Sequence, residues 1–399
     1  MNKIRKSYIK GWCWLIVGLL FGCSQSPDEL APSEQFVRVY QHGVKSGVEP
    51  IDFVQTADSG FLIMNRWKRE LATGYGTYLM KVDNEGVTEW DLLIDEFFIN
   101  PMPDIISLGG EILIAGIDTR KNVTQFLMVD VATGDVTLKK YFSSLGVPLA
   151  ACSTGEDEFL IQYYDEVQKQ SGIALLSSNL YIQWNKRFNV TEDGDQLVSL
   201  LNAFARGTPP FFVVNHENEV LSNMVVGSSI SLIELTKTYG VVSSEIDGNP
   251  ETAMVRNAYP LGDRKYAIAL TNYYNSGLMP KFTIQDVDFS NTLGLLSDQF
   301  MDLDPTSSVS TCEAIINGKP YLLYATTTRS LQVKIVAFNK ENGFLAGAHY
   351  LGERYGFHAV DILATDDGGL ILLASTSAVD TNSSVALFKL SKKDLEDML

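Results

Sequence analysis

The chain has 399 residues, and its 48 acidic residues outnumber its 31 lysines and arginines, which gives a formal charge of −17. So acidic a protein will not bind nucleic acid or an anionic surface through its overall field. Hydrophobic residues make up 45% and charged residues 20%, which is ordinary for a globular protein. The negative charge therefore indicates solubility rather than a particular partner.

The N-terminus has the pattern of an export signal. Residues 1–10 carry four basic side chains and no acid, and residues 11–22 are apolar but too few to span a bilayer, which takes about 20 residues. The run Leu20-Phe21-Gly22-Cys23 then resembles the lipobox of bacterial lipoproteins, although Phe21 stands where Ala, Ser or Thr is commoner. The resemblance implies removal of residues 1–22 and acylation of Cys23. An ordinary cleaved signal and an uncleaved anchor are the alternatives.

The same segment predicts where the protein resides. A lipid on Cys23 would anchor it in the bacterial envelope, and we expect the outer membrane, on either its periplasmic or its surface side. Residues 23–35 are rich in Ser, Pro and acids and are expected to form a flexible tether. Residues 36–399 then form the folded domain.

Hairpin patterns recur about every fifty residues in that domain. A strand, a tight turn and a second strand occur in six segments, 51–67, 104–117, 150–164, 256–274, 312–327 and 359–376. Each is followed by a further hairpin, and these lie at 77–90, 126–141, 174–184, 231–246, 282–300 and 333–350. Four strands per repeat with no helical periodicity is typical of a β-propeller blade.

The ends of the domain predict how the propeller closes. The run VALFKL (385–390) matches the third strand of a blade, and FVRVY (36–40) has no blade before it. We expect FVRVY to complete the last blade, which closes the ring and removes an open sheet edge. Counting Tyr40 with the ends of the other outer strands gives an all-β, seven-bladed propeller of four-stranded blades. In the fourth blade, residues 191–210 form a long insertion, or residues 211–226 form an extra hairpin.

One repeat carries a recognisable signature. Residues 82–90 read Val-Asp-Asn-Glu-Gly-Val-Thr-Glu-Trp, in which Asp83, Gly86 and Trp90 follow an apolar run. This order resembles the repeats of pyrroloquinoline-quinone-like and WD40-like propellers, and it fades in the other blades. The resemblance covers residues 36–399 at the level of architecture and implies a fold far more than a function.

The sequence contains few motifs that indicate a catalytic or metal-binding site. None of the histidines, His42, His216, His349 and His358, forms a pair with zinc-ligand spacing, and no phosphate-binding or nucleophile motif is present. The two cysteines beyond Cys23, Cys152 and Cys312, are expected to be buried free thiols in different blades. We therefore expect no catalytic residue, no metal and no cofactor.

One group of loops differs from the others in the residues that it carries. Loops between second and third strands, and loops between blades, meet at one face of a propeller, and here they carry basic and aromatic residues that interfaces favour. The predicted binding residues are Arg66, Trp67, Arg120, Tyr163, Tyr164, Tyr273, Tyr274, Arg329, Arg354 and Tyr355. The alternative is that strands simply end in aromatic residues and that the basic side chains are solvated.

These observations predict a lipid-anchored propeller that acts as a ligand- or protein-binding module or scaffold. A glycan, an acidic peptide or an envelope protein would suit the predicted face. The alternatives are a scaffold for outer-membrane assembly and a glycan-active hydrolase or lyase, for which no pair of carboxylates can be chosen from the sequence.

Overall fold

The computed structural model describes residues 35–41, 47–69, 74–94, 97–204, 210–248, 254–272, 274–284, 298–353, 355–377 and 383–399. The chain divides into two units, residues 1–32 and 33–399, and the first lies outside the described residues together with Cys23 and most of the expected tether. The described part is built mainly of antiparallel strands, which confirms the all-β expectation. No described helix is long and apolar enough to cross a membrane.

Four consecutive stretches of chain each fold into one four-stranded antiparallel sheet, with the strands in chain order. Their strands are β11 (Val147–Ser153), β12 (Glu158–Asp165), β13 (Gln170–Ser177) and β14 (Ile182–Asn189); β15 (Val213–His216), β16 (Glu219–Val226), β17 (Ser229–Thr236) and β18 (Val242–Gly248); β19 (Met254–Gly262), β20 (Lys265–Thr271), β21 (Ser276–Thr283) and β22 (Asp298–Phe300); and β23 (Val309–Ile316), β24 (Lys319–Thr327), β25 (Val333–Asn339) and β26 (Leu345–Leu351). Three of these sheets contain both hairpins of one sequence repeat, and the sheet of β15–β18 contains the hairpin at 231–246.

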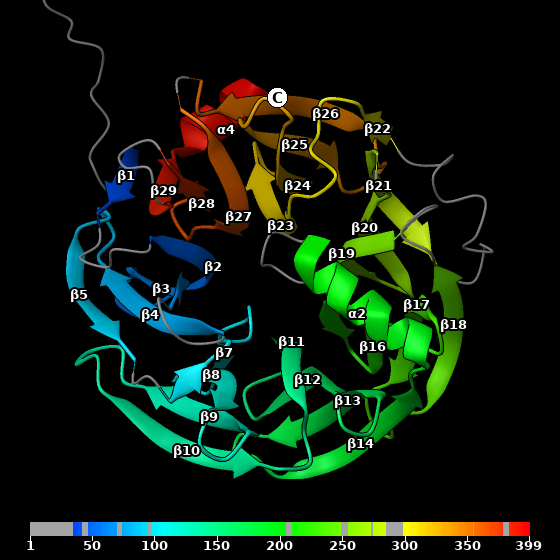
Figure 1. Cartoon of the computed structure of the whole chain (residues 1–399). Coiled ribbons are helices and arrows are strands. Elements are labelled where there is room, and N and C mark those ends of the chain that lie inside the picture. The colour runs from blue at the N-terminus through cyan, green and yellow to red at the C-terminus, as the bar shows by residue number, and fades with distance from the viewer. Residues whose placement is uncertain are drawn as a thin grey trace, which may run out of the picture. The chain divides into compact units, whose positions relative to one another are not determined.

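The preceding stretch forms a nine-stranded sheet. It contains two sets of four antiparallel strands, joined by the short β6 (Phe98–Ile99), which pairs with β4 and β8. The sets are β2 (Val48–Gln55), β3 (Phe61–Lys68), β4 (Tyr75–Val82) and β5 (Thr88–Leu93), and β7 (Ile106–Leu108), β8 (Glu111–Asp118), β9 (Val123–Val129) and β10 (Val136–Phe142). Within residues 33–399, Figure 1 shows the sheets arranged around a common centre with their first strands innermost.

The remaining sheet joins the two ends of the domain. Strand β1 (Phe36–Tyr40) pairs antiparallel with β29 (Ser384–Leu390), with Phe36 opposite Lys389 and Tyr40 opposite Val385. The sheet continues through β28 (Leu370–Thr376) to β27 (Phe357–Ala364). The expected pairing of FVRVY with VALFKL is therefore present, and it covers the edge that β29 would otherwise expose.

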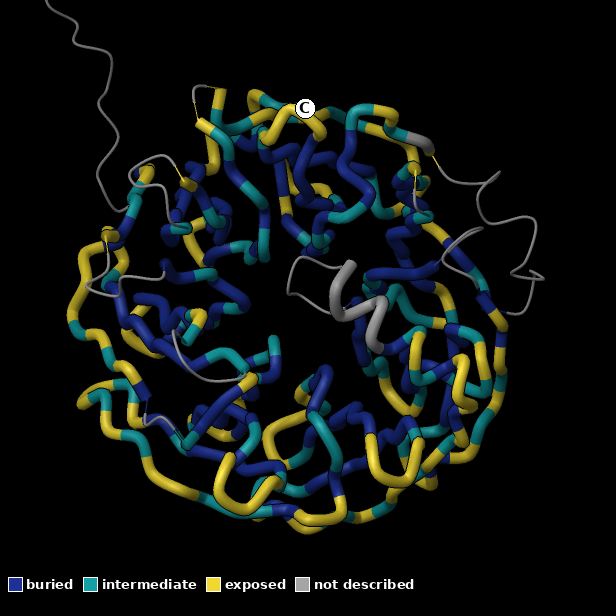
Figure 2. The backbone as a smooth tube through the Cα atoms, in the orientation of Figure 1, coloured by how far each residue is buried: buried dark blue, intermediate teal, exposed yellow. Residues whose placement is uncertain are grey.

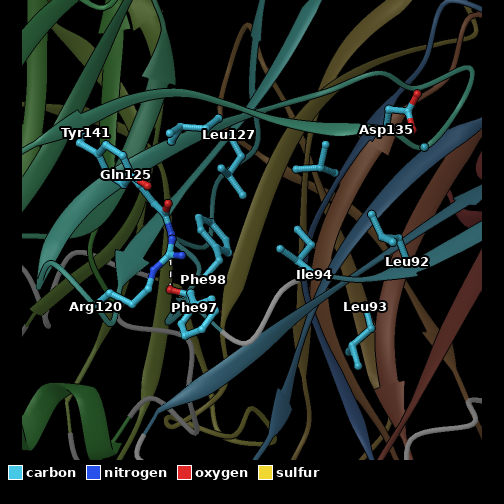
Figure 3. A pocket seen from close by; sticks show the side chains of 13 residues that line it. Leu92, Leu93, Ile94, Phe97, Phe98, Arg120, Gln125, Leu127, Asp135 and Tyr141 are labelled. Atoms are coloured by element: carbon cyan, nitrogen blue, oxygen red, sulfur yellow. Dashed lines mark hydrogen bonds between the residues drawn. The ribbon is translucent and has the colours of Figure 1, made fainter.

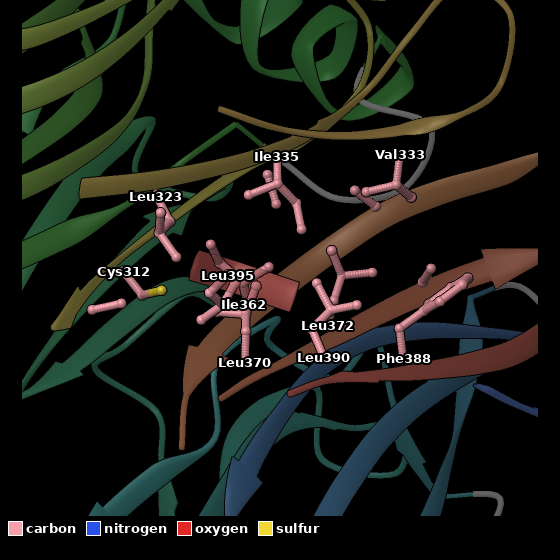
Figure 4. Packing of buried hydrophobic residues seen from close by; sticks show 14 of the residues in the cluster. Cys312, Leu323, Val333, Ile335, Ile362, Leu370, Leu372, Phe388, Leu390 and Leu395 are labelled. Atoms are coloured by element: carbon pink, nitrogen blue, oxygen red, sulfur yellow. The ribbon is translucent and has the colours of Figure 1, made fainter. Parts of the chain in front are cut away.

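Two helices depart from the expected all-strand pattern. Helix α2 (Glu192–Phe204) lies in the 191–210 insertion and contacts β16, and residues 213–248 form one complete sheet, so the insertion alternative holds for this repeat. Helix α4 (Lys392–Met398) follows β29, and Ser391 and Asp394 form a capping box at its start. Its Leu395 is buried among residues of the last two sheets, as Figure 4 shows.

Burial follows the order of strands within each sheet. The second and third strands are buried on both faces, whereas an outer strand such as β14 alternates between partly buried and exposed residues. Figure 2 shows the same gradient, with exposed residues gathered along the outer strands. The core therefore lies between adjacent sheets rather than in one central mass.

Aromatic residues on three outer strands contact the next set of four strands along the chain. Trp90 Nε1 donates to Val131 O at 2.9 Å, and its ring packs on Gly134, which has a positive φ of 78°. Trp184 repeats this arrangement: Nε1 donates to Lys237 O at 2.6 Å and the ring covers Gly240. Glycine is needed because a Cβ would meet the ring and strain the turn.

The N-terminal strand makes the third such contact. Phe36 pairs with Lys389 as Trp90 pairs with Lys81, and the Phe36 ring packs on Gly86. The fifty-residue spacing aligned Tyr40 with Trp90, so this alignment was wrong. Tyr40 instead donates from its hydroxyl to Gly86 O at 2.8 Å. We call the three aromatic contacts, made by Phe36, Trp90 and Trp184, the rim contacts.

Candidate functional site

Two of the predicted binding tyrosines, Tyr163 and Tyr164, are buried, which does not fit the predicted role in ligand binding. Tyr163 is fully buried: its hydroxyl donates to Asn185 Oδ1 at 2.8 Å and its ring covers Gly172, its partner across the hairpin. Tyr164 is 3% exposed, and its hydroxyl donates to Asp195 Oδ1 at the start of α2. Neither ring is available for stacking on a ligand, because each fills space within or between sheets.

Trp67 has the same packing role as Tyr163. Its ring covers Gly76, the residue opposite it on β4, and leaves no room for a Cβ there. Arg66 is 9% exposed; Nε and Nη2 donate to Glu49 Oε2 at 2.8 and 2.7 Å, and the guanidinium stacks on Tyr75. These contacts fix Arg66 in one orientation at the edge of the centre.

Arg120 lines a groove on the outside of the nine-stranded sheet. It pairs with Asp118 Oδ2 at 2.8 Å and lies over the Phe97 ring, 4.2 Å from the ring centroid. The groove has a volume of about 380 Å³ and is lined by residues of β5, β9 and β10, as Figure 3 shows. The Asp118 carboxylate neutralises the guanidinium, and the Phe97 ring lies against it. Arg120 therefore forms part of the groove wall but adds little positive charge there.

Three predicted residues, Tyr274, Arg329 and Tyr355, lie in loops that contact one another. Arg329 donates through Nε to Met301 O at 3.1 Å and through Nη2 to Tyr274 O, so it joins two neighbouring loops. Tyr355 precedes Gly356, which packs on Leu331. Large side chains here are exposed, with Tyr274 at 71%, Met301 at 68%, Tyr355 at 57% and Leu331 at 39%. We call Tyr274, Met301, Arg329, Leu331 and Tyr355 the loop-face patch.

Two predicted residues, Tyr273 and Arg354, lie outside the described residues, next to members of this patch in the sequence. The sequence analysis missed Met301 and Leu331, because neither is basic or aromatic. Leu331 lies in the same turn as the predicted Arg329, which was a usable signal, whereas Met301 follows β22 in a connection that carries no predicted residue. The expected face is therefore present only in part, over the sheets that contain β21, β24 and β27.

The centre of the domain contains a cavity of about 150 Å³. It is lined mainly by first strands and the segments leading into them, including Asp52, Asp104, Arg256, Asn257 and Asp361. We call it the central channel. Its three carboxyl groups come from separate parts of the chain, which is why no local motif predicted them.

Irregular pairing brings these residues to the channel. The first strand shifts register by one residue in four sheets, between Pro50 and Asp52, Pro148 and Ala150, Val255 and Asn257, and Ala359 and Asp361. Such β-bulges re-aim side chains. The inserted residues are Ile51, Leu149, Arg256 and Val360. Arginine thus occupies one position where the other three sheets have an aliphatic residue.

The channel carboxyl groups bind strand amides. Asp52 Oδ2 accepts a hydrogen bond from Ile105 N at 2.5 Å, and Asp104 Oδ2 accepts one from Ala151 N at 2.7 Å, each in the next set of strands. Asp361 Oδ1 accepts from Ile362 N at 2.8 Å and from the Ser310 hydroxyl of the preceding sheet. The bonds from Ile105, Ala151 and Ser310 connect neighbouring sets of strands at the centre, as the rim contacts do outside.

Burial sets the charge state of these groups. It raises the pKa of Asp104 to about 7, an effect opposed by the Ala151 amide and reinforced by the charge of Asp361. Burial also raises the pKa of Asp52 and of Asp361 above their usual range, and for Asp52 the charges of Asp361 and Asp104 add to it. Burial and the negative charge of a neighbouring carboxylate both favour the neutral form of a carboxyl group.

Other titratable groups give no sign of a metal centre. Among the described residues, no three His, Cys, Asp or Glu side chains are placed to hold a metal ion. Cys152 and Cys312 are free thiols, and burial raises the pKa of Cys312 to about 12. A thiol held protonated in this way is a poor nucleophile.

Comparison with known proteins supports the fold and goes no further. No family model matches the chain, and no curated protein sequence matches it. Among solved structures, the Dos1 propeller is 9% identical over 89% of this chain and 95% of its own, with a TM-score of 0.52. Hydrazine synthase from Kuenenia stuttgartiensis is 11% identical over 87% of this chain and 98% of its own, with a TM-score of 0.50.

A third similar structure is the β-propeller domain of the trilobed protease from Pyrococcus furiosus. It is 10% identical and covers 88% of this chain and 98% of its own, with a TM-score of 0.45. At such identities a likeness shows the fold alone. Together with the sheets described above, the likeness to the Dos1 propeller shows that this chain has a β-propeller architecture.

Proposed function

We propose that this chain is a lipid-anchored propeller of the bacterial envelope that binds another envelope protein through the loop-face patch. The observation that carries the proposal is that Tyr274, Met301, Leu331 and Tyr355 are exposed and lie in loops that contact one another, since Arg329 donates to Met301 O and Tyr274 O and Gly356 packs on Leu331. Tyrosine, methionine and arginine are enriched at protein interfaces, and exposed apolar groups that lie together indicate an interaction site.

The form of the patch favours a protein over a glycan. Small ligands are usually held in concave sites that bury most of their surface. The patch consists of loop side chains that project into solvent, which suits the broad surface of another protein. Arg329 is the charged residue of the patch, so an acidic segment of the partner, flanked by apolar residues, would fit it best.

We further infer a closed ring of seven blades. Five four-stranded sheets and the two four-stranded sets of the nine-stranded sheet supply the blades, and the pairing of β1 with β29 supports closure by the N-terminal strand. A closed propeller presents its loops on one rigid scaffold, which keeps the patch organised before binding and lowers the entropy cost of association.

Anchoring is the second part of the proposal. Acyl chains on Cys23 contribute about 0.8 kcal/mol per buried CH₂, so two or three chains would hold the protein at the membrane. We expect Cys23→Ala to leave an unprocessed precursor or to release the protein into the soluble periplasmic fraction, as fractionation and immunoblotting would show. A native protein that begins at Met1 would contradict this.

No reaction is proposed. The carboxyl groups that could serve as a general acid and base, Asp52, Asp104 and Asp361, all accept hydrogen bonds from strand amides. This engagement favours a role in joining sheets rather than in proton transfer to a substrate.

A photo-crosslinking amino acid placed at Tyr355 tests partner binding in cells. We expect one discrete crosslinked product, and we expect a Tyr274→Ala, Met301→Ala double substitution to reduce its yield at least tenfold. The same amino acid at Tyr239, which is 77% exposed on a different hairpin, is the matched control. Equal products from Tyr355 and Tyr239, or a yield unaffected by the double substitution, would reject the patch as a binding surface.

A further inference from the structure

The central channel contains a buried positive charge as well as three carboxyl groups. Arg256 lines the channel and is 6% exposed. Within the described residues its side chain forms no ion pair and makes a single hydrogen bond, from Nη1 to Pro305 O at 3.0 Å. Burying a charged group is costly unless that group is paired. Arg256 therefore lacks the anionic partner that its burial requires.

One nitrogen of this guanidinium remains available. Nε is closed off from solvent without a partner. Nη2 likewise makes no hydrogen bond within the described residues, but it is not closed off, and the central channel is the described cavity that Arg256 lines. A molecule in the channel can therefore accept a hydrogen bond from Nη2. Burial lowers the pKa of Arg256 to about 10, so the group stays charged at neutral pH.

The acids near Arg256 do not pair with it. Asp304 is the acid whose charge acts on the pKa of Arg256, and its Oδ1 already accepts hydrogen bonds from the amide and the hydroxyl of Thr306, at 2.9 and 2.7 Å. The three channel carboxyl groups make no comparable contribution to that pKa. The cation and the carboxyl groups therefore occupy separate parts of the channel.

The channel carboxyl groups retain acceptor capacity. Asp104 makes one hydrogen bond within the described residues, through Oδ2, which leaves Oδ1 for a ligand. Asp52 and Asp361 share a hydrogen bond with each other, which requires one of them to be protonated. All three side chains are partly exposed rather than buried. An ammonium group beside them would replace the shared proton and stabilise the ionised carboxylates.

We propose that the central channel binds a small zwitterion, a short aliphatic amino acid, whose carboxylate pairs with Arg256 and whose ammonium pairs with Asp104 and the Asp52–Asp361 pair. A carboxylate offers the acceptors that a guanidinium prefers, and an ammonium offers three donors to the carboxyl oxygens. The site is separate from the loop-face patch, and the proposal does not rest on partner binding there.

The size and the remaining wall of the channel suit such a ligand. Its volume of about 150 Å³ is that of about five water molecules at roughly 30 Å³ each. A molecule of about five to seven heavy atoms therefore fits. Ile51, Phe211, Val309 and Val360 also line the channel, and they would contact the methylene groups of the ligand.

Binding is tested with purified protein that begins at Ser24 and so contains the whole unit 33–399. The probes are glycine, β-alanine and 4-aminobutyrate, in which one, two and three methylene groups separate the carboxylate from the ammonium. Propionate and propylammonium carry one charge each and serve as ligand controls. Calorimetry and ligand-observed NMR measure each Kd. We expect at least one zwitterion to bind with a millimolar or lower Kd, at least tenfold tighter than either control.

Two variants separate binding from folding. Arg256→Leu introduces an aliphatic residue of the kind found at the equivalent bulge positions, such as Leu149. It should weaken binding of the preferred zwitterion at least tenfold and leave the melting temperature without ligand unchanged or higher, because a buried unpaired charge is removed. Asp104→Asn can still accept from Ala151 N and should weaken binding at least fivefold without loss of stability. Arg187→Leu removes an exposed arginine from the outer strand β14; it is the matched control and should bind as wild type does.

Failure of all three zwitterions to bind overturns the proposal. Equally tight binding of propylammonium or propionate also overturns it, because the channel would then be a site for a single charge. Intact binding in Arg256→Leu, or an equal loss in Arg187→Leu, has the same meaning. If Arg256→Leu loses stability together with binding, Asp104→Asn decides: unchanged binding in that variant rejects the site, and weaker binding supports it.

Discussion

The rim and the central channel of this propeller connect neighbouring sheets in different ways. At the rim the same contact recurs, with Phe36, Trp90 and Trp184 each covering a glycine of the next set of four strands. At the channel, equivalent bulge positions hold different residues, and Arg256 replaces the aliphatic side chain of the other sheets. Repeated contacts between neighbours carry the stability of a repeat protein. Residues that break the repeat are therefore where particular functions should be sought.

Removing the N-terminal strand should cause the largest loss of stability. Deletion of residues 36–41 exposes the edge of β29 and removes Phe36 and Tyr40, which are 8% and 9% exposed. We expect a loss of more than about 4 kcal/mol, or aggregation, from the buried area and the lost strand pairing. Thermal and urea unfolding measure it. Val37→Ala, at an exposed position of the same strand, is the control, and a deletion variant as stable as the control would show that β1 does not hold the sheet.

A single rim contact should have the next largest effect. Trp90→Ala removes both the hydrogen bond to Val131 O and the ring that covers Gly134, so we expect a loss of about 2–4 kcal/mol in urea unfolding. Trp90→Phe keeps a ring and should lose only about 1 kcal/mol. A loss below about 0.5 kcal/mol for the alanine variant would mean that the rim contacts do not join the sheets.

The contribution of the central channel to stability should depend on pH. Burial raises the pKa of Asp104 to about 7 in the folded protein, so its ionisation opposes folding. The stability that its neutral form provides is complete below about pH 4 and is lost as pH rises to about 7. Asp104→Asn cannot ionise and can still accept from Ala151 N. Relative to wild type, the variant should therefore gain up to about 3 kcal/mol between pH 5 and pH 8.

Urea unfolding of both proteins at the two pH values measures this difference. A constant difference between variant and wild type at pH 5 and pH 8 would mean that Asp104 has an ordinary carboxyl environment. The channel would then be well hydrated, and the contrast with the rim would weaken.

The hairpins could be predicted from sequence because their signals are local. Alternating apolar residues and turn residues such as those at Asp83–Gly86 define strand pairs within a few positions, and the structure places sheets in these segments. Pairing of β1 with β29 was predictable because a lone strand pattern and an incomplete last repeat complement each other. Helix α2 was missed because it lies in an insertion that belongs to no repeat.

The site was harder to predict because orientation is not a local property. Tyr163 and Tyr274 look alike in the sequence, but the first covers Gly172 across its hairpin while the second is exposed in a loop. A glycine opposite an aromatic residue is a usable signal for packing, and it would also have identified Trp67. The channel carboxyl groups depend on one-residue bulges and on contacts between distant strands, which no short motif encodes.

Patch residues should have the smallest effect on stability. Tyr274→Ala and Tyr355→Ala change exposed side chains, so each should alter the unfolding free energy by no more than about 0.5 kcal/mol. Thermal unfolding of the single variants checks this. A loss as large as that of Trp90→Ala would assign these rings to packing and remove the basis for a free binding surface.

The central claim is that stability and partner binding are carried by different residues. The most direct test measures both properties in Trp90→Ala and in a Tyr274→Ala, Tyr355→Ala double variant, with the photo-crosslinking amino acid at Met301 and at a temperature where both remain folded. We predict that Trp90→Ala loses stability and keeps the crosslinked product, whereas the tyrosine variant keeps its stability and loses the product. Loss of both properties together in either variant would contradict the claim.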